Sequence, residues 1–379
     1  MVVAIVEAMD PDSPGIGGGE TYSRNLLQYL LKTGIRTFFV GVSAARGRVT
    51  EGNLTFLPVT SKTTLGNQGF VLRIALSRAF AALPPGAIVH VQRPEYALPF
   101  VLFCHRCPKV VTLHGRILHG VRLKQSPTVA RAYRMVESLC LRRSAAVIAV
   151  DDGTREFYEK EYPWLRGRIR IVPIGIDLSR FQVMDRAAMR ARHGFGTAEK
   201  VVMFVGRLEI EKDLGFLIES FRLVIPRVPE ARLVLVGDGR HRAQLEELAR
   251  DLVPEKVLFL GARPPDSIPE LLNCADVLTL CSMYEGSPTT VKEALACGVP
   301  VVTAPVGDVA QIIREEATGR IAPKDPAQYA AAIVEVLSHT DPDGVRQACR
   351  RAAAEFGFDR IGERTVQVYG EVTAPEVTA

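Results

Sequence analysis

Two glutamates, Glu285 and Glu293, stand eight positions apart across the expected start of a helix. Ser287 is a good N-cap residue, and Pro288 suits the first helical position. Gly298 suits the C-terminal cap. Apolar residues recur between these ends at helical spacing, at Val291, Ala294 and Leu295. The sequence therefore predicts Glu285 in the loop before the helix and Glu293 about 8 Å along it.

The backbone between the two acids lies where this helix begins, at Gly286, Ser287, Pro288 and Thr289. Unpaired N–H groups and the helix dipole make such a position an anion site. A ligand with a phosphate at the helix end and hydroxyl groups on both sides would fit between the carboxylates. A nucleotide-sugar is such a ligand.

The stretch EGSPTTVKEALACGVPVV, which begins at Glu285, resembles the Glu-x7-Glu motif of the retaining family 4 glycosyltransferases. The resemblance implies the GT-B fold, an α/β protein with two Rossmann-like parallel-sheet domains facing a central cleft. It also implies transfer of a sugar from a nucleotide-diphosphate sugar to an acceptor hydroxyl, with retention of configuration. Glu293 would then bind the ribose hydroxyls. Glu285 would bind the donor sugar and stabilise an oxocarbenium-like centre.

The rest of the chain has the pattern of two such domains. A length of 379 residues suits two separate cores. Short β-branched runs alternate with helical patterns, as is typical of parallel α/β sheets. We expect an acceptor-binding domain at 1–175 and a nucleotide-sugar-binding domain at 176–356. The resemblance implies that the last helix, about 357–372, packs back on the first domain and that the cleft closes during the reaction. The expected strands lie near 2–7, 36–42, 54–59, 87–91, 109–113, 145–150, 169–173, 201–206, 232–236, 257–260, 276–280, 299–303 and 320.

A glycine-rich loop, which includes Gly17, Gly18 and Glu20, follows the first expected strand and precedes a helix expected near Thr21. Glycines let the backbone approach a ligand closely, and a helix start favours negative charge. The loop lacks the last glycine of a Rossmann fingerprint and the lysine of a P-loop. It resembles the family's Gly-Gly-x-Glu loop, in which Gly17 and Gly18 would face the donor diphosphate. The alternative is a plain turn.

Two cations follow the first strand of the second half. Gly206 and Arg207 end that strand, and Lys212 comes five residues later. Arginine can clamp a diphosphate through its planar fork and lysine as a point charge. Ligands of open α/β sheets bind at this carboxyl edge. The segment resembles the family's Gly-Arg…Lys pair, so Arg207 and Lys212 would neutralise the leaving diphosphate.

Three further residues complete the expected site. His114 ends a strand of the first half, where the family often has a histidine that reaches the donor sugar. A structural hydrogen bond is the alternative role for it. Gly261 and Arg263 follow the strand near 257–260, and by the same resemblance they would line the pocket of the base.

We expect no cofactor and no metal, with the nucleotide-diphosphate sugar acting as a substrate. Asp10-Pro-Asp12 and Asp341-Pro-Asp343 imitate the Asp-x-Asp of metal-dependent sugar transferases. Neither lies where that other fold would require it. Cationic side chains and helix ends can supply the charge that a metal would otherwise provide.

Positive charge is concentrated in the first half, where residues 1–177 hold 23 Lys and Arg against 13 Asp and Glu. The patch 104–143 suits peripheral contact with an anionic membrane surface or an anionic acceptor. A solvated surface near a phosphate site is the alternative. The patch has one acid, Glu137, and nine cations, Arg106, Lys109, Arg116, Arg122, Lys124, Arg131, Arg134, Arg142 and Arg143.

Three features favour the cytoplasm, with or without attachment to the inner face of the membrane. No apolar run reaches 18 residues, so we expect no membrane span. The first residues lack the basic region and cleavage site of a signal peptide. The seven cysteines form no disulfide framework and suit a reducing compartment.

The resemblance favours a UDP-sugar donor and a saccharide, lipid-linked or small-molecule acceptor, in the synthesis of cell-surface polysaccharide or glycoconjugate. One alternative is a GT-B nucleotide-sugar epimerase, which requires no acceptor. Another is a basic nucleotide- or nucleic-acid-binding module. We expect no nucleic acid partner, because the basic stretch is poor in aromatic residues and the net charge is only +5.

Overall fold

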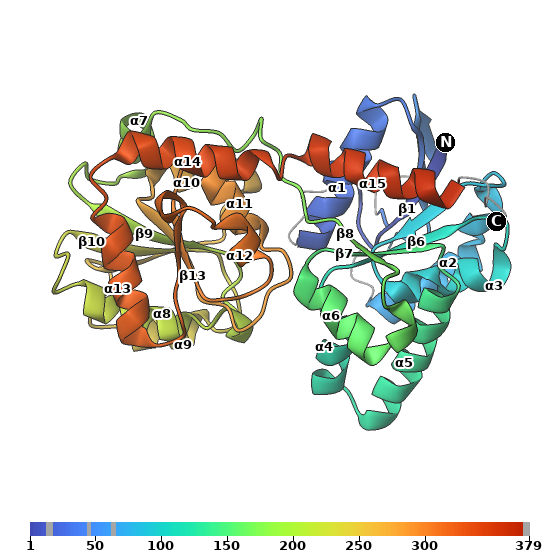
Figure 1. Cartoon of the computed structure of the whole chain (residues 1–379), viewed down its shortest axis with the longest axis horizontal. Coiled ribbons are helices and arrows are strands. Elements are labelled where there is room, and N and C mark those ends of the chain that lie inside the picture. Colours follow the sequence, from blue (N-terminus) through green and yellow to red (C-terminus); the bar gives the residue numbers. More distant parts are fainter. Residues whose placement is uncertain (13–17, 44–46, 62–65, 374–379) are drawn as a thin grey trace. The chain divides into compact units, whose positions relative to one another are not determined.

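The computed structural model describes residues 1–12, 18–43, 47–61 and 66–373, which form two compact units (Figure 1). Unit 1 comprises Met1–Gly175 and Phe358–Ala379, and unit 2 comprises Ile176–Gly357. The chain therefore leaves unit 1, completes unit 2 and returns to unit 1 for its last helix. The expected fold class, two parallel-sheet α/β units, is confirmed.

Unit 1 is built on an eight-stranded sheet with the order β3-β4-β2-β1-β5-β6-β7-β8. Every neighbouring pair is parallel except β3 with β4. All the strands expected in this half are present, and the short edge strand β3 is an addition. The strands are β1 (Val2–Val6), β2 (Arg36–Gly41), β3 (Val49–Glu51), β4 (Leu54–Pro58), β5 (Ile88–Val91), β6 (Lys109–Leu113), β7 (Ala146–Ala149) and β8 (Ile169–Ile171).

Both faces of this sheet are buried. In β1, Val3 and Ile5 belong to one apolar cluster, whereas Ala4 and Val6 belong to another. Successive side chains of a strand point to opposite faces, so the two clusters are the two sides of the sheet. Unit 1 has the helices α1 (Gly18–Lys32), α2 (Asn67–Ser77), η1 (Ala79–Ala82), η2 (Pro94–Ala97), α3 (Leu98–Phe103), α4 (Ile117–Lys124), α5 (Pro127–Arg142), α6 (Asp152–Glu161), η3 (Pro163–Leu165) and α15 (Phe358–Thr373).

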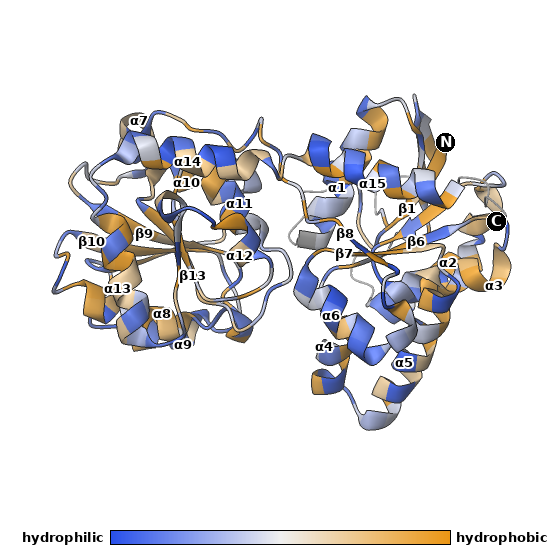
Figure 2. Ribbon diagram, viewed as in Figure 1, coloured by the Kyte–Doolittle hydropathy of each residue, from blue (hydrophilic) through white to orange (hydrophobic). Residues whose placement is uncertain are grey.

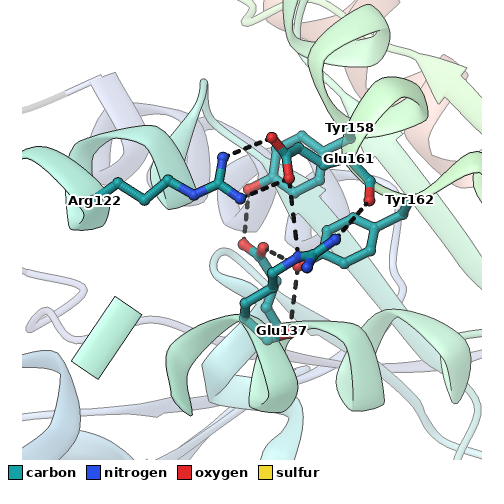
Figure 3. Close-up of polar contacts among 6 residues, drawn as sticks. Arg122, Glu137, Tyr158, Glu161 and Tyr162 are labelled. Carbon is teal, nitrogen blue, oxygen red and sulfur yellow. Dashed lines mark hydrogen bonds and ion pairs between the residues drawn. The ribbon is translucent and has the colours of Figure 1, made fainter. Parts of the chain in front are cut away.

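A buried carboxyl group fastens α5 to the end of α6 (Figure 3). The hydroxyl groups of Tyr158 and Tyr162 donate to Glu137 over 2.9 and 2.7 Å. Burial raises the pKa of Glu137 to about 7, against the lowering effect of these two hydrogen bonds. Arg122 of α4 donates to both oxygens of Glu161, over 2.6 and 2.7 Å. The hairpin of α4 and α5 is thus fixed to α6 at two points.

Helix α15 packs against α1 and closes one face of unit 1. A side chain on Gly362 would lie 2.3 Å from the ring of Tyr29, so only glycine permits this approach. The imidazole of the fully buried His90 bridges Tyr369 Oη and Thr112 Oγ1, each at 2.6 Å. Burial, and then the neighbouring His114, lower the pKa of His90 to about 3. The neutral ring therefore links α15 to two central strands.

Unit 2 is built on a six-stranded, fully parallel sheet with the order β11-β10-β9-β12-β13-β14. All the strands expected in this half are present. The strands are β9 (Lys200–Val205), β10 (Ala231–Val236), β11 (Val257–Gly261), β12 (Val277–Leu280), β13 (Val301–Thr303) and β14 (Gly319–Ile321). The helices are α7 (Arg186–His193), η4 (Ile210–Lys212), α8 (Leu214–Val224), α9 (Arg242–Leu248), η5 (Pro265–Ser267), α10 (Ile268–Cys274), α11 (Thr289–Ala296), α12 (Val309–Ile312), η6 (Glu316–Thr318), α13 (Pro326–Leu337) and α14 (Pro342–Ala354).

The two Asp-x-Asp sequences have local structural contacts. Asp341 caps α14, where its side chain accepts the N–H of Gly344 over 2.9 Å. Asp10 accepts the N–H of Asp12 over 3.1 Å. Within the described ranges, no helix is both long and apolar enough to cross a lipid bilayer.

The bond between Tyr369 and His90 yields a test of how α15 contributes to unit 1. We expect Tyr369→Phe to lower the free energy of unfolding of unit 1 by about 1–3 kcal/mol, because it leaves a buried ring nitrogen without its partner. Urea unfolding followed by the fluorescence of Trp164 measures this, since the only tryptophan of the chain lies in unit 1. Tyr284→Phe is the control, because Tyr284 is 55% exposed. Equal midpoints for the two variants would contradict the expectation.

Candidate functional site

Several predicted donor-binding residues of unit 2 lie where the order of successive strands in its sheet reverses. The chain proceeds from β9 to β10 and β11 on one side, and then returns to β12 on the other side of β9. The carboxyl ends of β9 and β12 therefore form a topological switch point, the position at which open α/β sheets bind ligands. Gly206, Arg207 and Lys212 follow β9, and Glu285 follows β12.

Lys212 and Glu285 meet directly across this switch point. Lys212 Nζ lies 2.5 Å from Glu285 Oε1, and Ser282 Oγ donates to the same oxygen over 2.6 Å. The two charged side chains are only 18% and 17% exposed. The thiol of Cys281 donates to the backbone oxygen of Lys212 over 3.1 Å, which ties the two loops together. The Lys212 amino group and the Glu285 carboxyl group are thus held together at the edge of the sheet, and both side chains remain partly exposed.

Arg207 belongs to the same edge but reaches further into solvent. Its side chain is 60% exposed, and Nη2 lies 3.2 Å from Glu211 Oε1. The backbone oxygen of Glu211 accepts the N–H of Met283 over 2.8 Å, so this acid also joins the loops after β9 and β12. The structure therefore connects Arg207 to the Lys212–Glu285 pair through Glu211 and Met283.

Glycines bring the ends of β9, β10 and β11 close together. Gly237, at φ +140°, approaches Gly206 so closely that a Cβ would lie 1.8 Å from its carbonyl oxygen. The N–H of Gly237 donates to Gly261 O over 2.9 Å. The predicted Gly206 and Gly261 therefore share this edge. Arg263 is exposed, and within the described part of the chain no hydrogen bond or ion pair joins it to the other predicted site residues.

Glu293 lies half-buried on α11. Burial raises the pKa of Glu293 to about 7, against the lowering effects of the positive charge of Arg180 and a hydrogen bond with Thr289. The structure therefore brings together Thr289 and Glu293, two of the predicted residues. Near neutral pH, this carboxyl group can either donate or accept a hydrogen bond.

The prediction of how α11 begins was wrong by one residue. Pro288 is the N-cap, and the helix starts at Thr289. Ser287 lies outside the helix because its hydroxyl is held at 2.6 Å from Asp308 Oδ2. Lys292 Nζ lies 3.0 Å from the same oxygen and also donates to Ser287, and the side chains of Lys292 and Asp308 are almost fully buried. The tertiary contact with Asp308 therefore takes precedence over the local capping preference.

Asp308 also holds the loop that carries Glu285. Its N–H donates to the carbonyl of Gly286 over 3.1 Å. Gly307, at φ +56°, is close enough that a Cβ would lie 1.9 Å from that carbonyl oxygen. Sequence reasoning missed Asp308 and Lys292. The available signal was Lys292 itself, a charge between the apolar positions of a helix, which needs a buried partner.

Unit 1 has its own switch point, between β1 and β5. At the end of the next strand, His114 Nε2 lies 2.9 Å from Gln92 Oε1, and its ring packs edge-on against Tyr22. Burial, and then the positive charge of Arg93, lower the pKa of His114 to about 3. The ring is therefore neutral, and its buried Nδ1 has no partner among the described residues. Gly18 begins α1, and the predicted Gly17 lies outside the described residues.

Three further charged groups at this edge were not predicted. Glu7 follows β1, and burial raises its pKa to about 7. Arg93 follows β5, and its Nε lies 2.6 Å from Glu95 Oε1, while Tyr133 donates to Glu95 Oε2 over 2.9 Å. The signal in the sequence is a charged residue just past a buried strand: Glu7 comes directly after β1, and Arg93 comes two residues after β5. Among the described residues, no three His, Cys, Asp or Glu side chains gather in a way that could hold a metal ion.

Two family descriptions together match nearly the whole chain. Residues 16–180 match Glycosyltransferase Family 4, and residues 185–356 match Glycosyl transferases group 1. An uncharacterised glycosyltransferase of Methanocaldococcus jannaschii is 31% identical over 251 residues, which cover 63% of this chain and 63% of that protein. D-inositol 3-phosphate glycosyltransferase of Nocardia farcinica is 34% identical over 216 residues, which cover 54% of this chain and 48% of that protein. The chain thus spans between about half and two thirds of the curated relatives that it matches.

Solved structures of similar fold match over almost the full length. Sucrose-phosphate synthase from Thermosynechococcus elongatus has a TM-score of 0.83 at 22% identity, covering 98% of this chain and 99% of that one. Anabaena HepE in complex with UDP-glucose has a TM-score of 0.76 at 20% identity, covering 98% and 100%. Two parallel α/β units with the topology described above define a protein of the GT-B fold. Together with the family matches, this shows that the chain belongs to the family 4 glycosyltransferases.

The buried pair of Lys292 and Asp308 yields a test in unit 2. We expect Asp308→Asn to lower the free energy of unfolding of this unit by about 3–5 kcal/mol, because it leaves the Lys292 ammonium buried without a counter-charge. Urea unfolding followed by circular dichroism measures the loss, while the Trp164 fluorescence transition of unit 1 should not move. Asp251→Asn is the control, since its pair with Arg222 is exposed to solvent and therefore contributes little to stability. Similar losses in the two variants would contradict this reading.

Glu293 yields a test that depends on pH. Its folded pKa lies above the ordinary value of 4.5, so the folded state binds the proton more tightly and loses stability as pH rises from about 4.5 to about 7. Glu293→Gln cannot titrate and should escape this loss. We expect it to be more stable than the unsubstituted protein by about 1–3 kcal/mol at pH 8 and to differ little near pH 4.5. A difference of the same size at both pH values, measured by urea unfolding, would count against a raised pKa.

Proposed function

We propose that this protein transfers a sugar from a UDP-sugar to an acceptor hydroxyl with retention of anomeric configuration. The observation that carries the proposal is the pair of Lys212 and Glu285 at the switch point of unit 2, with Glu293 on the helix that follows. Family membership supports the class of reaction. The complex of Anabaena HepE with UDP-glucose supports the choice of donor.

Positive groups at the edge of unit 2 would bind the donor diphosphate. Arg207 offers an exposed guanidinium whose planar fork matches phosphate oxygens. Lys212 offers a point charge that Glu285 and the backbone contacts of Cys281 hold in place. These cations would stabilise the charge that develops on the leaving diphosphate. On this basis we propose that transfer requires no metal ion.

The two glutamates would bind opposite ends of the donor. Glu293, whose carboxyl group is close to half-protonated at neutral pH, suits a ribose whose hydroxyl groups both donate and accept. Glu285 is held by Lys212 and Ser282 through one oxygen, Oε1. Its other oxygen could accept a hydroxyl of the donor sugar and stabilise positive charge at the reacting carbon. Gly206 and Gly261 would let the base and the diphosphate approach the backbone.

The edge of unit 1 would bind the acceptor, a saccharide or glycoconjugate. Glu7 and Arg93 flank its switch point, and His114 lies at the end of the next strand with one buried ring nitrogen unpaired among the described residues. A carboxyl group, a guanidinium and a neutral imidazole together provide donors and acceptors for several hydroxyl groups. The neutral state of His114 suits it to accept a hydroxyl proton in a hydrogen bond.

A nucleotide-sugar epimerase would use the same donor site but would need no acceptor. The buried Nδ1 of His114, which has no partner among the described residues, favours the transferase, because a second substrate could bind it. Incubation with UDP-glucose alone distinguishes the two reactions. An epimerase would produce a second UDP-sugar, whereas a transferase would produce at most UDP and free sugar by hydrolysis.

Donor binding is tested with a thermal-shift panel of UDP-, GDP- and ADP-glucose, with and without EDTA. A ligand that binds only the folded state adds about 2.7 kcal/mol of stability at 100 times its dissociation constant. We expect a shift with UDP-glucose that EDTA does not change. Arg207→Ala should reduce the shift strongly and leave the Tm without ligand unchanged, because its side chain is 60% exposed.

Arg227→Ala, an exposed arginine of the same unit, is the matched control and should keep the full shift. No shift with any of the three nucleotide-sugars would overturn the proposed donor. A shift that EDTA abolishes would overturn metal-free binding. A full shift with Arg207→Ala would show that Arg207 does not contribute to donor binding.

A further inference from the structure

Exposed apolar side chains are concentrated on the helices α2 to α5 of unit 1. Leu72, Leu76, Leu102 and Phe103 are between 49% and 65% exposed on α2 and α3. Leu123 and Met135, on α4 and α5, are 69% and 73% exposed. Large apolar side chains rarely lie so open in clusters unless something covers them.

The same helices carry positive charge and almost no negative charge. Between Glu51 and Glu137 the sequence has eleven Lys and Arg but a single acid, Glu95. Glu95 is buried and paired with Arg93, so it adds no negative charge to the surface. The surface between the cations therefore consists of apolar and neutral polar groups.

Helix α5 carries exposed apolar and cationic side chains on the same face. Arg131, Met135, Leu139 and Arg142 stand at i, i+4, i+8 and i+11, which is a single stripe on a helix. All four are exposed, whereas the opposite side of the helix is buried against unit 1. Figure 2 shows hydrophobic and hydrophilic residues mixed along the outer parts of α4 and α5.

The end of α4 continues this surface. Leu123 and Lys124 are exposed where α4 turns into α5, and α4 packs along α5. Not every cation of the patch expected from the sequence belongs to it. Lys109 is buried in β6 and donates to Cys104 O over 2.7 Å, and Arg122 is paired with Glu161. We define the basic helical face by Leu123, Lys124, Arg131, Met135, Leu139 and Arg142.

We propose that the basic helical face docks on the surface of an anionic lipid bilayer. Apolar side chains enter the boundary between headgroups and acyl chains, while the lysine and arginine side chains stay at the anionic headgroups. Each cation near such a surface adds to the attraction. The absence of exposed acids between the cations removes the repulsion that an ordinary mixed surface would meet there. The proposal concerns attachment and stands apart from the sugar transfer.

The experiment is vesicle flotation of the full chain. The vesicles contain phosphatidylcholine alone or with about one third phosphatidylglycerol, because anionic lipid supplies the surface potential. We expect binding only to the anionic vesicles, and weaker binding as salt shortens the screening length. Lys124→Gln with Arg131→Gln should lower the partition coefficient about 30-fold, or roughly fivefold for each cation. Leu123→Ser with Met135→Ser should weaken binding at every salt concentration.

Arg227→Gln with Leu223→Ser is the matched control. It removes one cation and one exposed apolar side chain from unit 2, where Leu223 is 46% exposed, and should bind vesicles like the unsubstituted protein. Unchanged Trp164 unfolding curves show that the face variants remain folded. No flotation with anionic vesicles, equal flotation with neutral ones, or equal losses in the control would each overturn the proposal. Salt-dependent binding to RNA or DNA without vesicle binding would overturn it as well.

Discussion

The loop that carries Glu285 depends on one buried charge pair. Lys292 and Asp308 lie 3.0 Å apart with almost no exposure to water, and both contact Ser287. Asp308 also fixes the carbonyl of Gly286 through its backbone N–H. Removing two charges from water is costly, and replacing such a pair by apolar residues often stabilises a protein. The pair is therefore better explained by the loop that it positions than by the stability of unit 2. In that loop Glu285, the residue before Gly286, contacts Lys212.

The sequence was sufficient for the fold because burial on both faces of a parallel sheet produces apolar runs of distinctive length. Strand β3 was missed, since three residues with no buried side chain leave no such run. The positions of Glu285 before α11 and of Glu293 on it were predictable, because one short motif contains its own geometry. The partner of Ser287 could not be predicted, because Asp308 reaches it from a different strand end, 21 residues away. Local sequence preferences predict where a helix starts only when no tertiary contact competes for the capping residue.

Both units hold carboxyl groups in conditions that favour the protonated form. Burial raises the pKa of Glu293 and of Glu7 to about 7, and each lies at the carboxyl edge of its sheet or on the helix just after it. Near neutral pH these groups therefore reduce the stability of the fold. Groups with shifted pKa values often gather at functional sites, which agrees with the proposed role of these edges. The pKa of the buried Glu137 is raised as well, although Tyr158 and Tyr162 both donate to it, so a raised pKa does not by itself identify a site.

Helix α15 makes unit 1 discontinuous in sequence, and this affects the order of events on the ribosome. Residues 1–175 emerge first, but α15, which covers one face of unit 1 and carries Tyr369, the partner of His90, is synthesised only after all of unit 2. At the usual rate of about 5–20 residues per second, the wait lasts roughly 10–40 seconds. During that time the apolar side of α1 is uncovered, whereas unit 2 is continuous and can complete its fold. A chaperone that binds nascent chains would therefore meet unit 1 in this unfinished state.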